Sequence, residues 1–120
     1  MKNSNRPLIG LAVLVLLLSG ASQWWAGWND KQVAVQVASL AHPGDIRMLA
    51  SETCAYCASA RAWLTTYQVP FSECTIERDA DCRAAYEAHR SPGTPVLIVR
   101  GKPQLGFSPE RLRQALTPSG

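Results

Sequence analysis

The sequence predicts a small mixed α/β domain that follows an apolar N-terminal helix. Three observations lead to this prediction. The chain of 120 residues has room for one domain, and short apolar segments that suit strands alternate with segments that suit helices. A Cys-x-x-Cys pair, Cys54 and Cys57, falls between the first of these strands and the first of these helices. The expected order of elements in the domain is β-α-β-α-β-β-α.

Residues 1–28 are predicted to be an export signal or a membrane anchor. Lys2 and Arg6 precede an apolar run, residues 8–18. The run is short for a spanning helix, and the small residues 19–21 suit a signal-peptidase site. The wider segment 7–28, however, has about the 20 residues that a span needs.

Three tryptophans favour the anchor over the cleaved signal. Trp24, Trp25 and Trp28 lie where an aromatic belt would meet the membrane surface, so contact with the membrane is expected through residues 8–28. Positive charge before the apolar run predicts that the domain lies on the far side of the membrane, which in a bacterium is the periplasm. The alternative is secretion to the periplasm after cleavage of the signal.

Residues 29–44 are interpreted as a linker or accessory segment. Val33, Val35 and Val37 alternate with small or polar residues, which is typical of a strand, but the composition also permits a helix that continues from the membrane. This segment is therefore left unassigned. Pro43 and Gly44 form a turn signal, and the folded domain is predicted over residues 45–117.

The domain begins with a predicted strand, residues 45–50, and a predicted helix, residues 58–67. Cys54 therefore falls at a helix N-terminus. Unpaired backbone N–H groups and the helix dipole favour a thiolate there and lower the cysteine pKa from its usual value of about 8.5. The thiolate is the nucleophile in disulfide exchange, and Cys57 lies close enough to resolve a mixed disulfide.

The remaining elements follow from breaks and caps. Val69 and Pro70 end the first helix, and residues 71–77 suit a second strand. Asp79 or Asp81 can cap a helix that runs to about residue 89. After a loop, residues 95–100 form the strongest strand pattern, and a turn at 101–103 leads to a brief strand at 104–106. Residues 108–110 then open the last helix with a serine cap and a proline at its first position.

This order and its motifs resemble the thioredoxin fold, and glutaredoxin-like proteins in particular. The resemblance covers about residues 45–116 and includes the segment 53–57, which is similar to the Cys-Pro-Tyr-Cys motif with alanine in place of proline. It also includes Thr94-Pro95 before the third strand and Gly106-Phe107 before the last helix. The loop 93–95 looks more like that of thioredoxin-like proteins than the Thr-Val-Pro of glutaredoxins.

The resemblance implies a thiol–disulfide oxidoreductase with Cys54 and Cys57 as its catalytic pair, and the N-terminal segment predicts that it is extracytoplasmic. It implies that Pro95 is cis and lies against these cysteines, that the backbone of Thr94 pairs with an extended substrate, and that Tyr56 covers the pair or contacts the substrate. Protein or glutathione disulfides are the expected partners. No tightly bound cofactor is implied, although glutathione is a possible co-substrate.

Cys74 and Cys82 permit three interpretations. A disulfide across the β-α connection is favoured in an oxidising compartment, where closing such a loop contributes about 2–3 kcal/mol. A redox relay with Cys54 and Cys57 is the second. A four-cysteine zinc site is the third, although the last pair lacks the usual short knuckle spacing, and no metal site is predicted.

The composition excludes one class of partner and leaves two non-catalytic hypotheses open. A formal charge of +3 with scattered basic residues does not predict nucleic-acid binding, and a monomer is expected. The chain could be a zinc-binding or disulfide-stapled module that reuses the fold. It could also be a tethered interaction domain that binds extended peptides at Pro95 without exchange chemistry.

Overall fold

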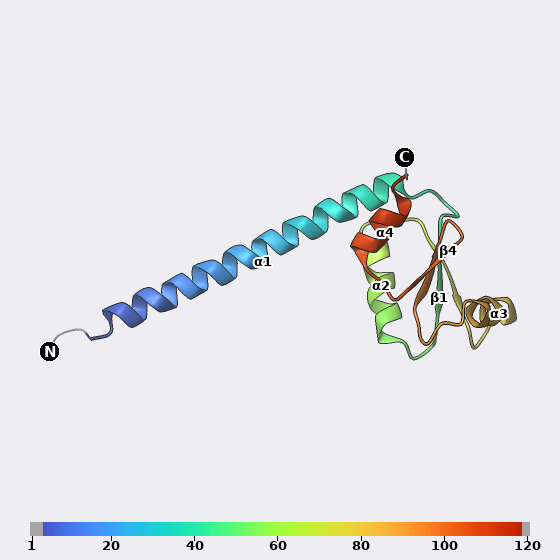
Figure 1. The fold of residues 1–120 in the computed structure, drawn as a ribbon, viewed down its shortest axis with the longest axis horizontal. Coiled ribbons are helices and arrows are strands. Elements are labelled where there is room, and N and C mark those ends of the chain that lie inside the picture. The colour runs from blue at the N-terminus through green and yellow to red at the C-terminus, as the bar shows by residue number, and fades with distance from the viewer. Residues whose placement is uncertain (1–3, 119–120) are drawn as a thin grey trace. The chain divides into compact units, whose positions relative to one another are not determined.

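A computed structural model describes residues 4–118 of the chain. Four helices and four strands follow one another in these residues (Figure 1). In chain order they are α1 (Arg6–Leu40), β1 (Ile46–Ala50), α2 (Ala55–Thr66), β2 (Ser72–Thr75), α3 (Ala80–Ala88), β3 (Val96–Val99), β4 (Lys102–Leu105) and α4 (Pro109–Leu116). The predicted order after the N-terminal helix is therefore confirmed, and the element boundaries shift by only a few residues.

The strands form one sheet in the order β2-β1-β3-β4. The two strands on either side of the α2 crossover, β1 and β2, are parallel, whereas β3 is antiparallel to both β1 and β4. A parallel pair needs a crossover connection, and α2 provides it. The Cys-x-x-Cys pair lies at the start of this crossover.

Helices cover both faces of the sheet. On one face, alternate residues of the central strands, among them Met48 and Leu97, pack with buried residues of α2, α4 and the end of α1. On the other face, Leu49 and Val96 pack against α3 through Cys82. Figure 1 shows α2 and α4 on one side of the strands and α3 on the other. The alternation follows from strand geometry, in which successive side chains point to opposite faces.

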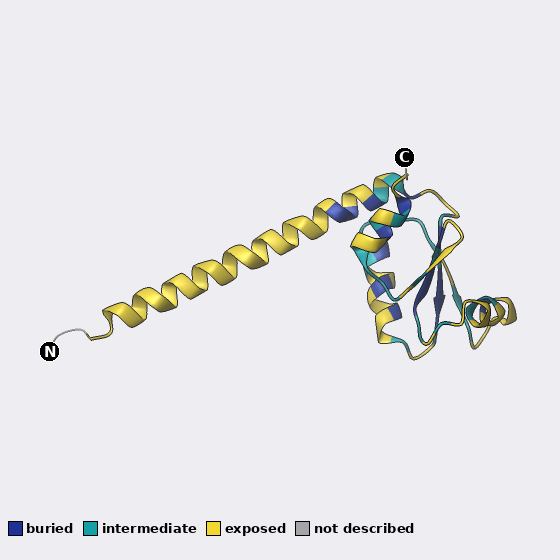
Figure 2. Cartoon of the chain, in the orientation of Figure 1, coloured by how far each residue is buried: buried dark blue, intermediate teal, exposed yellow. Residues whose placement is uncertain are grey.

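The segment 29–44 is mostly helical and partly belongs to the domain core. Helix α1 continues to Leu40, and Val33, Ala34 and Val37 are buried. The compact unit therefore begins at Val33, earlier than the domain start at residue 45 expected from the turn signal. In Figure 2 the buried positions of α1 are confined to its C-terminal part. The valines that alternate as in a strand therefore belong to a helix. Val33 and Val37 lie one turn apart on its buried face.

Arg100 ties the ends of two helices together. Its guanidinium donates hydrogen bonds to the carbonyl of Leu40, at the end of α1 (3.2 Å), and to the carbonyl of Leu116, at the end of α4 (3.0 Å). The last carbonyls of a helix lack partners within it, so a cation is favourable at both places. The same guanidinium contacts Asp45, which also accepts from the His42 backbone N–H (2.9 Å). These contacts lower the pKa of Asp45, chiefly through the His42 hydrogen bond.

The rest of α1 has the composition of a membrane span. Arg6–Leu40 is the one helix within residues 4–118 that is long and apolar enough to cross a membrane, with a mean hydropathy of 1.8 in its most apolar window and none of that window buried. A signal sequence meets the same criteria. The rings of Trp24 and Trp28 stack on one side of this helix, with centroids 6.2 Å apart.

Candidate active site at the Cys-x-x-Cys pair

The two cysteines of the motif lie at the N-terminus of α2 and form a disulfide, with Cα atoms 5.2 Å apart. Cys54 is the N-cap residue, and its Sγ accepts a hydrogen bond from the Cys57 backbone N–H at 3.0 Å. Cys57 is fully buried, whereas Cys54 is partly exposed. Cys54 is therefore the more exposed residue of the pair, and the helix N-terminus favours negative charge on its sulfur.

The loop that precedes Cys54 is fastened to the β2–α3 connection. The Ser51 hydroxyl donates to the Glu77 carboxylate, and the Glu52 backbone N–H donates to the same carboxylate at 3.2 Å. The Ser51 hydrogen bond is the main reason why the pKa of Glu77 lies below its usual value. Arg78 pairs with the Glu52 carboxylate. These contacts hold residues 51–52, which precede the motif, against the β2–α3 connection.

The charged residues nearest the motif in sequence are both paired elsewhere. Arg61 donates through Nε to both carboxylate oxygens of Glu73 on β2, at 3.0 and 2.8 Å. Glu52, whose charge would oppose a thiolate at Cys54, is paired with Arg78. Neither the Arg61 cation nor the Glu52 carboxylate therefore acts as a lone charge on Cys54.

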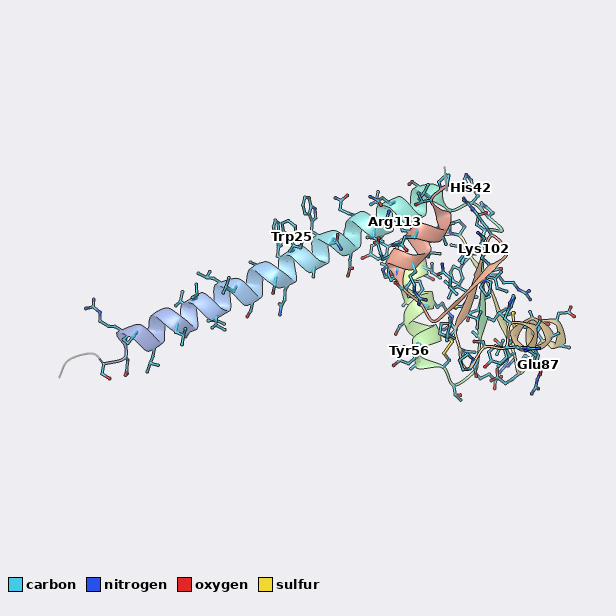
Figure 3. All side chains as sticks on the ribbon, viewed as in Figure 1. Trp25, His42, Tyr56, Glu87, Lys102 and Arg113 are labelled. Atoms are coloured by element: carbon cyan, nitrogen blue, oxygen red, sulfur yellow. A yellow bond between two sulfur atoms is a disulfide. The ribbon has the colours of Figure 1, made fainter. Side chains whose placement is uncertain are left out.

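A groove of about 450 Å³ adjoins the motif. Tyr56 from α2, Thr94 and Pro95 from the loop before β3, and Phe107 from the loop before α4 are among its lining residues. The Thr94–Pro95 peptide bond is cis. Tyr56 is 77% exposed, and Figure 3 labels it at the start of α2. The structure thus brings Tyr56, Thr94 and Pro95 to one groove, and their role in substrate binding stays a prediction.

Sequence reasoning missed two further groups in this groove. Arg111 on α4 and Leu105 at the end of β4 both line it. Arg111 Nη2 donates to the Leu105 carbonyl at 2.8 Å. Arg111 lies three residues after the cap serine Ser108, and no motif marks it; its contact with the end of β4 places it in the groove.

Cys74 and Cys82 form a second disulfide, which joins β2 to the first turn of α3. Cys82 is fully buried, and the sulfur of Cys74 lies 3.5 Å from Nη2 of Arg47. The four cysteines thus form two separate pairs, and no cluster of three or more potential ligands for a metal exists among residues 4–118. The four-cysteine zinc site has no counterpart in this arrangement.

Comparisons with known proteins agree with this geometry. Residues 46–103 match the family model described as glutaredoxin. The domain is similar to a mutant of the thioredoxin-like protein BC3987, with 27% identity, a TM-score of 0.55, and coverage of 61% of this chain and 95% of that one. It is similar to the glutaredoxin from Methanosarcina mazei Go1, with 25% identity, a TM-score of 0.52, and coverage of 61% and 78%. No curated protein sequence is similar enough to count as a relative.

Proposed function

The chain is a glutaredoxin-like protein of the thioredoxin fold, and from this premise we propose that it is a thiol–disulfide oxidoreductase whose catalytic pair is Cys54 and Cys57. The observation that carries the proposal is the unequal exposure of the pair. Cys54 is partly exposed at a helix N-terminus next to Tyr56, which lines the groove, and Cys57 is buried and bonded to it. Such a pair suits exchange with an external disulfide better than a purely structural role.

Acting as a reductant, the dithiol form works in two displacements. The Cys54 thiolate attacks a substrate disulfide, forms a mixed disulfide and releases one substrate thiolate. Cys57 then loses its proton, its sulfur attacks Cys54 Sγ, and the second substrate thiolate leaves. Two electrons pass to the substrate, the leaving thiolates take up the protons, and the protein ends as the Cys54–Cys57 disulfide. The reverse sequence oxidises a dithiol.

The groove is the proposed binding site for the substrate. In the loop before β3, the Pro95 carbonyl accepts a hydrogen bond from the Gly106 N–H at 2.8 Å. The backbone N–H and carbonyl of Thr94 have no hydrogen-bond partner among residues 4–118. An extended substrate can pair with these free backbone groups while its sulfur faces Cys54. A protein disulfide and glutathione disulfide both fit this description.

We also propose that α1 anchors the protein in a membrane with the domain on the extracytoplasmic side. Its apolar residues are exposed, for example Leu16 at 72% and Trp24 at 70%, and basic residues precede the apolar run. Two pairs of oxidised cysteines suit an oxidising compartment. The intact mass of the protein extracted from membranes checks the anchor, because cleavage after residue 21 would remove the N-terminal segment.

The test of the activity is a redox titration of the full chain in detergent micelles. The protein is equilibrated with glutathione buffers, and free thiols are assigned to individual cysteines by alkylation and mass spectrometry. We expect a reversible two-electron transition at Cys54–Cys57, with Cys74–Cys82 closed throughout. The potential then gives the direction, since about 30 mV corresponds to about 1.4 kcal/mol. The absence of a reversible transition at Cys54–Cys57 would contradict the proposal.

A further inference from the structure

The β2–α3 connection lies beside the residues that lead into the Cys-x-x-Cys motif. Strand β1 ends at Ala50 and α2 begins at Ala55, so four residues, 51–54, carry the chain from the sheet to the helix. We call these residues the β1–α2 link. The Ile76 backbone N–H donates to the Ala50 carbonyl at 2.9 Å, which extends the pairing of β1 with β2. The β2–α3 connection therefore starts next to the last residue of β1.

Glu77 holds the first half of the β1–α2 link. One oxygen of its carboxylate accepts from the Ser51 hydroxyl, and the other accepts from the Glu52 backbone N–H at 3.2 Å. Arg78, the next residue, pairs with the Glu52 carboxylate. Within residues 4–118, every hydrogen bond of residues 51–53 goes to Glu77 or Arg78. The entry of the chain into α2 thus depends on one exposed carboxylate and the residue that follows it.

The segment that carries Glu77 is itself held at both ends. The Cys74–Cys82 disulfide closes residues 74–82 into a ring. Inside this ring, the Asp79 backbone N–H donates to the Thr75 carbonyl at 3.1 Å, and the Asp79 carboxylate caps α3. Glu77 lies in the turn between these contacts. Its carboxylate therefore extends from a backbone that is fixed relative to β2 and α3.

The position of Cys54 matters because a helix N-terminus stabilises a thiolate only at close range. Cys54 is the N-cap residue of α2, and its Sγ accepts from the Cys57 backbone N–H at 3.0 Å. The unpaired N–H groups and the dipole of a helix act within its first turn. A displacement of the β1–α2 link moves the sulfur away from these groups and weakens the stabilisation of its charge.

We propose that Glu77 is a positioning residue for the nucleophile, which holds the β1–α2 link so that the Cys54 sulfur stays at the N-terminus of α2. The inference rests on the proposed function, in which the Cys54 thiolate attacks the substrate. The sign of its effect separates it from a direct effect of charge. A carboxylate near a thiol raises the thiol pKa, so removing its charge alone lowers the pKa of Cys54, whereas losing the position of the sulfur raises it.

The experiment measures the pH dependence of alkylation by iodoacetamide in the full chain, reduced, in detergent micelles. Mass spectrometry quantifies the product at Cys54. Glu77→Ala is expected to raise the pKa of Cys54 by roughly 0.2–0.7 unit, which slows alkylation roughly 1.5- to 5-fold at a pH below that pKa. Well above the pKa, where the thiolate is fully formed in both proteins, the two rates should agree within about 2-fold.

Two further variants assign the effect to the contacts of Glu77. Glu77→Gln removes the charge and keeps the contacts, because the glutamine oxygen can accept from the Glu52 N–H while its amide donates to the Ser51 hydroxyl. The pKa of Cys54 in this variant should not rise. Glu87→Ala is the matched control, since it removes an exposed carboxylate on α3 whose ion pair lies within that helix (Figure 3). It is expected to leave the pKa of Cys54 unchanged.

The outcomes of this experiment are separate from those of the redox titration. A pKa of Cys54 that falls or stays the same in Glu77→Ala would overturn the inference. An equal rise in Glu77→Gln would also overturn it, because the contacts that glutamine keeps would then not set the pKa, and so would an equal rise in Glu87→Ala. Alkylation needs no exchange partner, so a protein that shows the expected shifts but does not exchange disulfides would contradict the proposed function alone.

Discussion

Replacing Cys54 with serine is expected to reduce disulfide exchange to the background rate of the buffer. The hydroxyl of serine does not ionise at neutral pH, so the helix N-terminus at this position has no thiolate to stabilise. Cys57 cannot substitute for it, because its side chain is fully buried. The measurement is the turnover of a peptide disulfide by the reduced protein.

Replacing Cys57 with serine is expected to have a different result, which makes the pair of variants informative. Attack by Cys54 proceeds, but the mixed disulfide with the substrate has no internal thiol to resolve it and accumulates. Mass spectrometry in the absence of glutathione should find the substrate attached to Cys54. Free glutathione would release this adduct by attacking the same disulfide.

The control for both variants is the double replacement Cys74→Ser and Cys82→Ser. This pair joins β2 to α3 and is separate from the catalytic candidates, so exchange by Cys54 and Cys57 should continue in it. Retained turnover in Cys54→Ser, or adducts of Cys57→Ser that are attached through Cys74 or Cys82, would falsify the assignment of Cys54 as the nucleophile.

A chain that begins at Asp45 is expected to unfold or to be only marginally stable, whereas one that begins at Asn29 folds. The shorter chain loses Val33 and Val37, which are 8% and 0% exposed in the core. Burying two valines contributes roughly 3–6 kcal/mol, and the whole stability of a small domain is about 5–15 kcal/mol. Trp63 is the single tryptophan left in both truncated chains, so its fluorescence reports urea unfolding of the domain alone.

A matched pair of substitutions in α1 tests the same point without truncation. Val37→Ala removes two buried methyl groups and is expected to lower the free energy of unfolding by about 2–3 kcal/mol, including the cavity it leaves. Val35→Ala, at a position that is 66% exposed on the same helix, is expected to change it by at most about 0.5 kcal/mol. Equal effects of the two substitutions would show that the end of α1 does not pack in the core.

The sequence predicted the fold because its local signals agree with one another. The caps at Asp79 and Ser108 and the break at residues 69–70 each mark a boundary that the structure contains. The turn predicted at 101–103 lies instead at Arg100 and Gly101, because Lys102 and Pro103 already belong to β4. The secondary structure of the segment around Val33 was harder to predict. Three valines at alternate positions fit a strand, and only the tertiary packing of Val33 and Val37 against the domain decides in favour of a helix.

The place of the motif at a helix N-terminus after a strand could be predicted from the sequence, whereas the full lining of the groove could not. Its lining residues come from α2, the loop before β3, the end of β4 and the start of α4, which are far apart in the sequence. Ion pairs between distant elements also cannot be predicted from sequence patterns. Arg61 is twelve residues from Glu73, and no sequence pattern marks their pairing.

The burial of Cys57 has a kinetic consequence for the cell. In the proposed mechanism, both the substrate and the partner that restores the starting redox state react at Cys54, because Cys57 is fully buried in the structure. The two partners therefore compete for the same sulfur atom and must react with it one after the other, which is the pattern of ping-pong kinetics. An abundant substrate then slows regeneration, and the supply of the regenerating partner limits the flow of electrons through the domain.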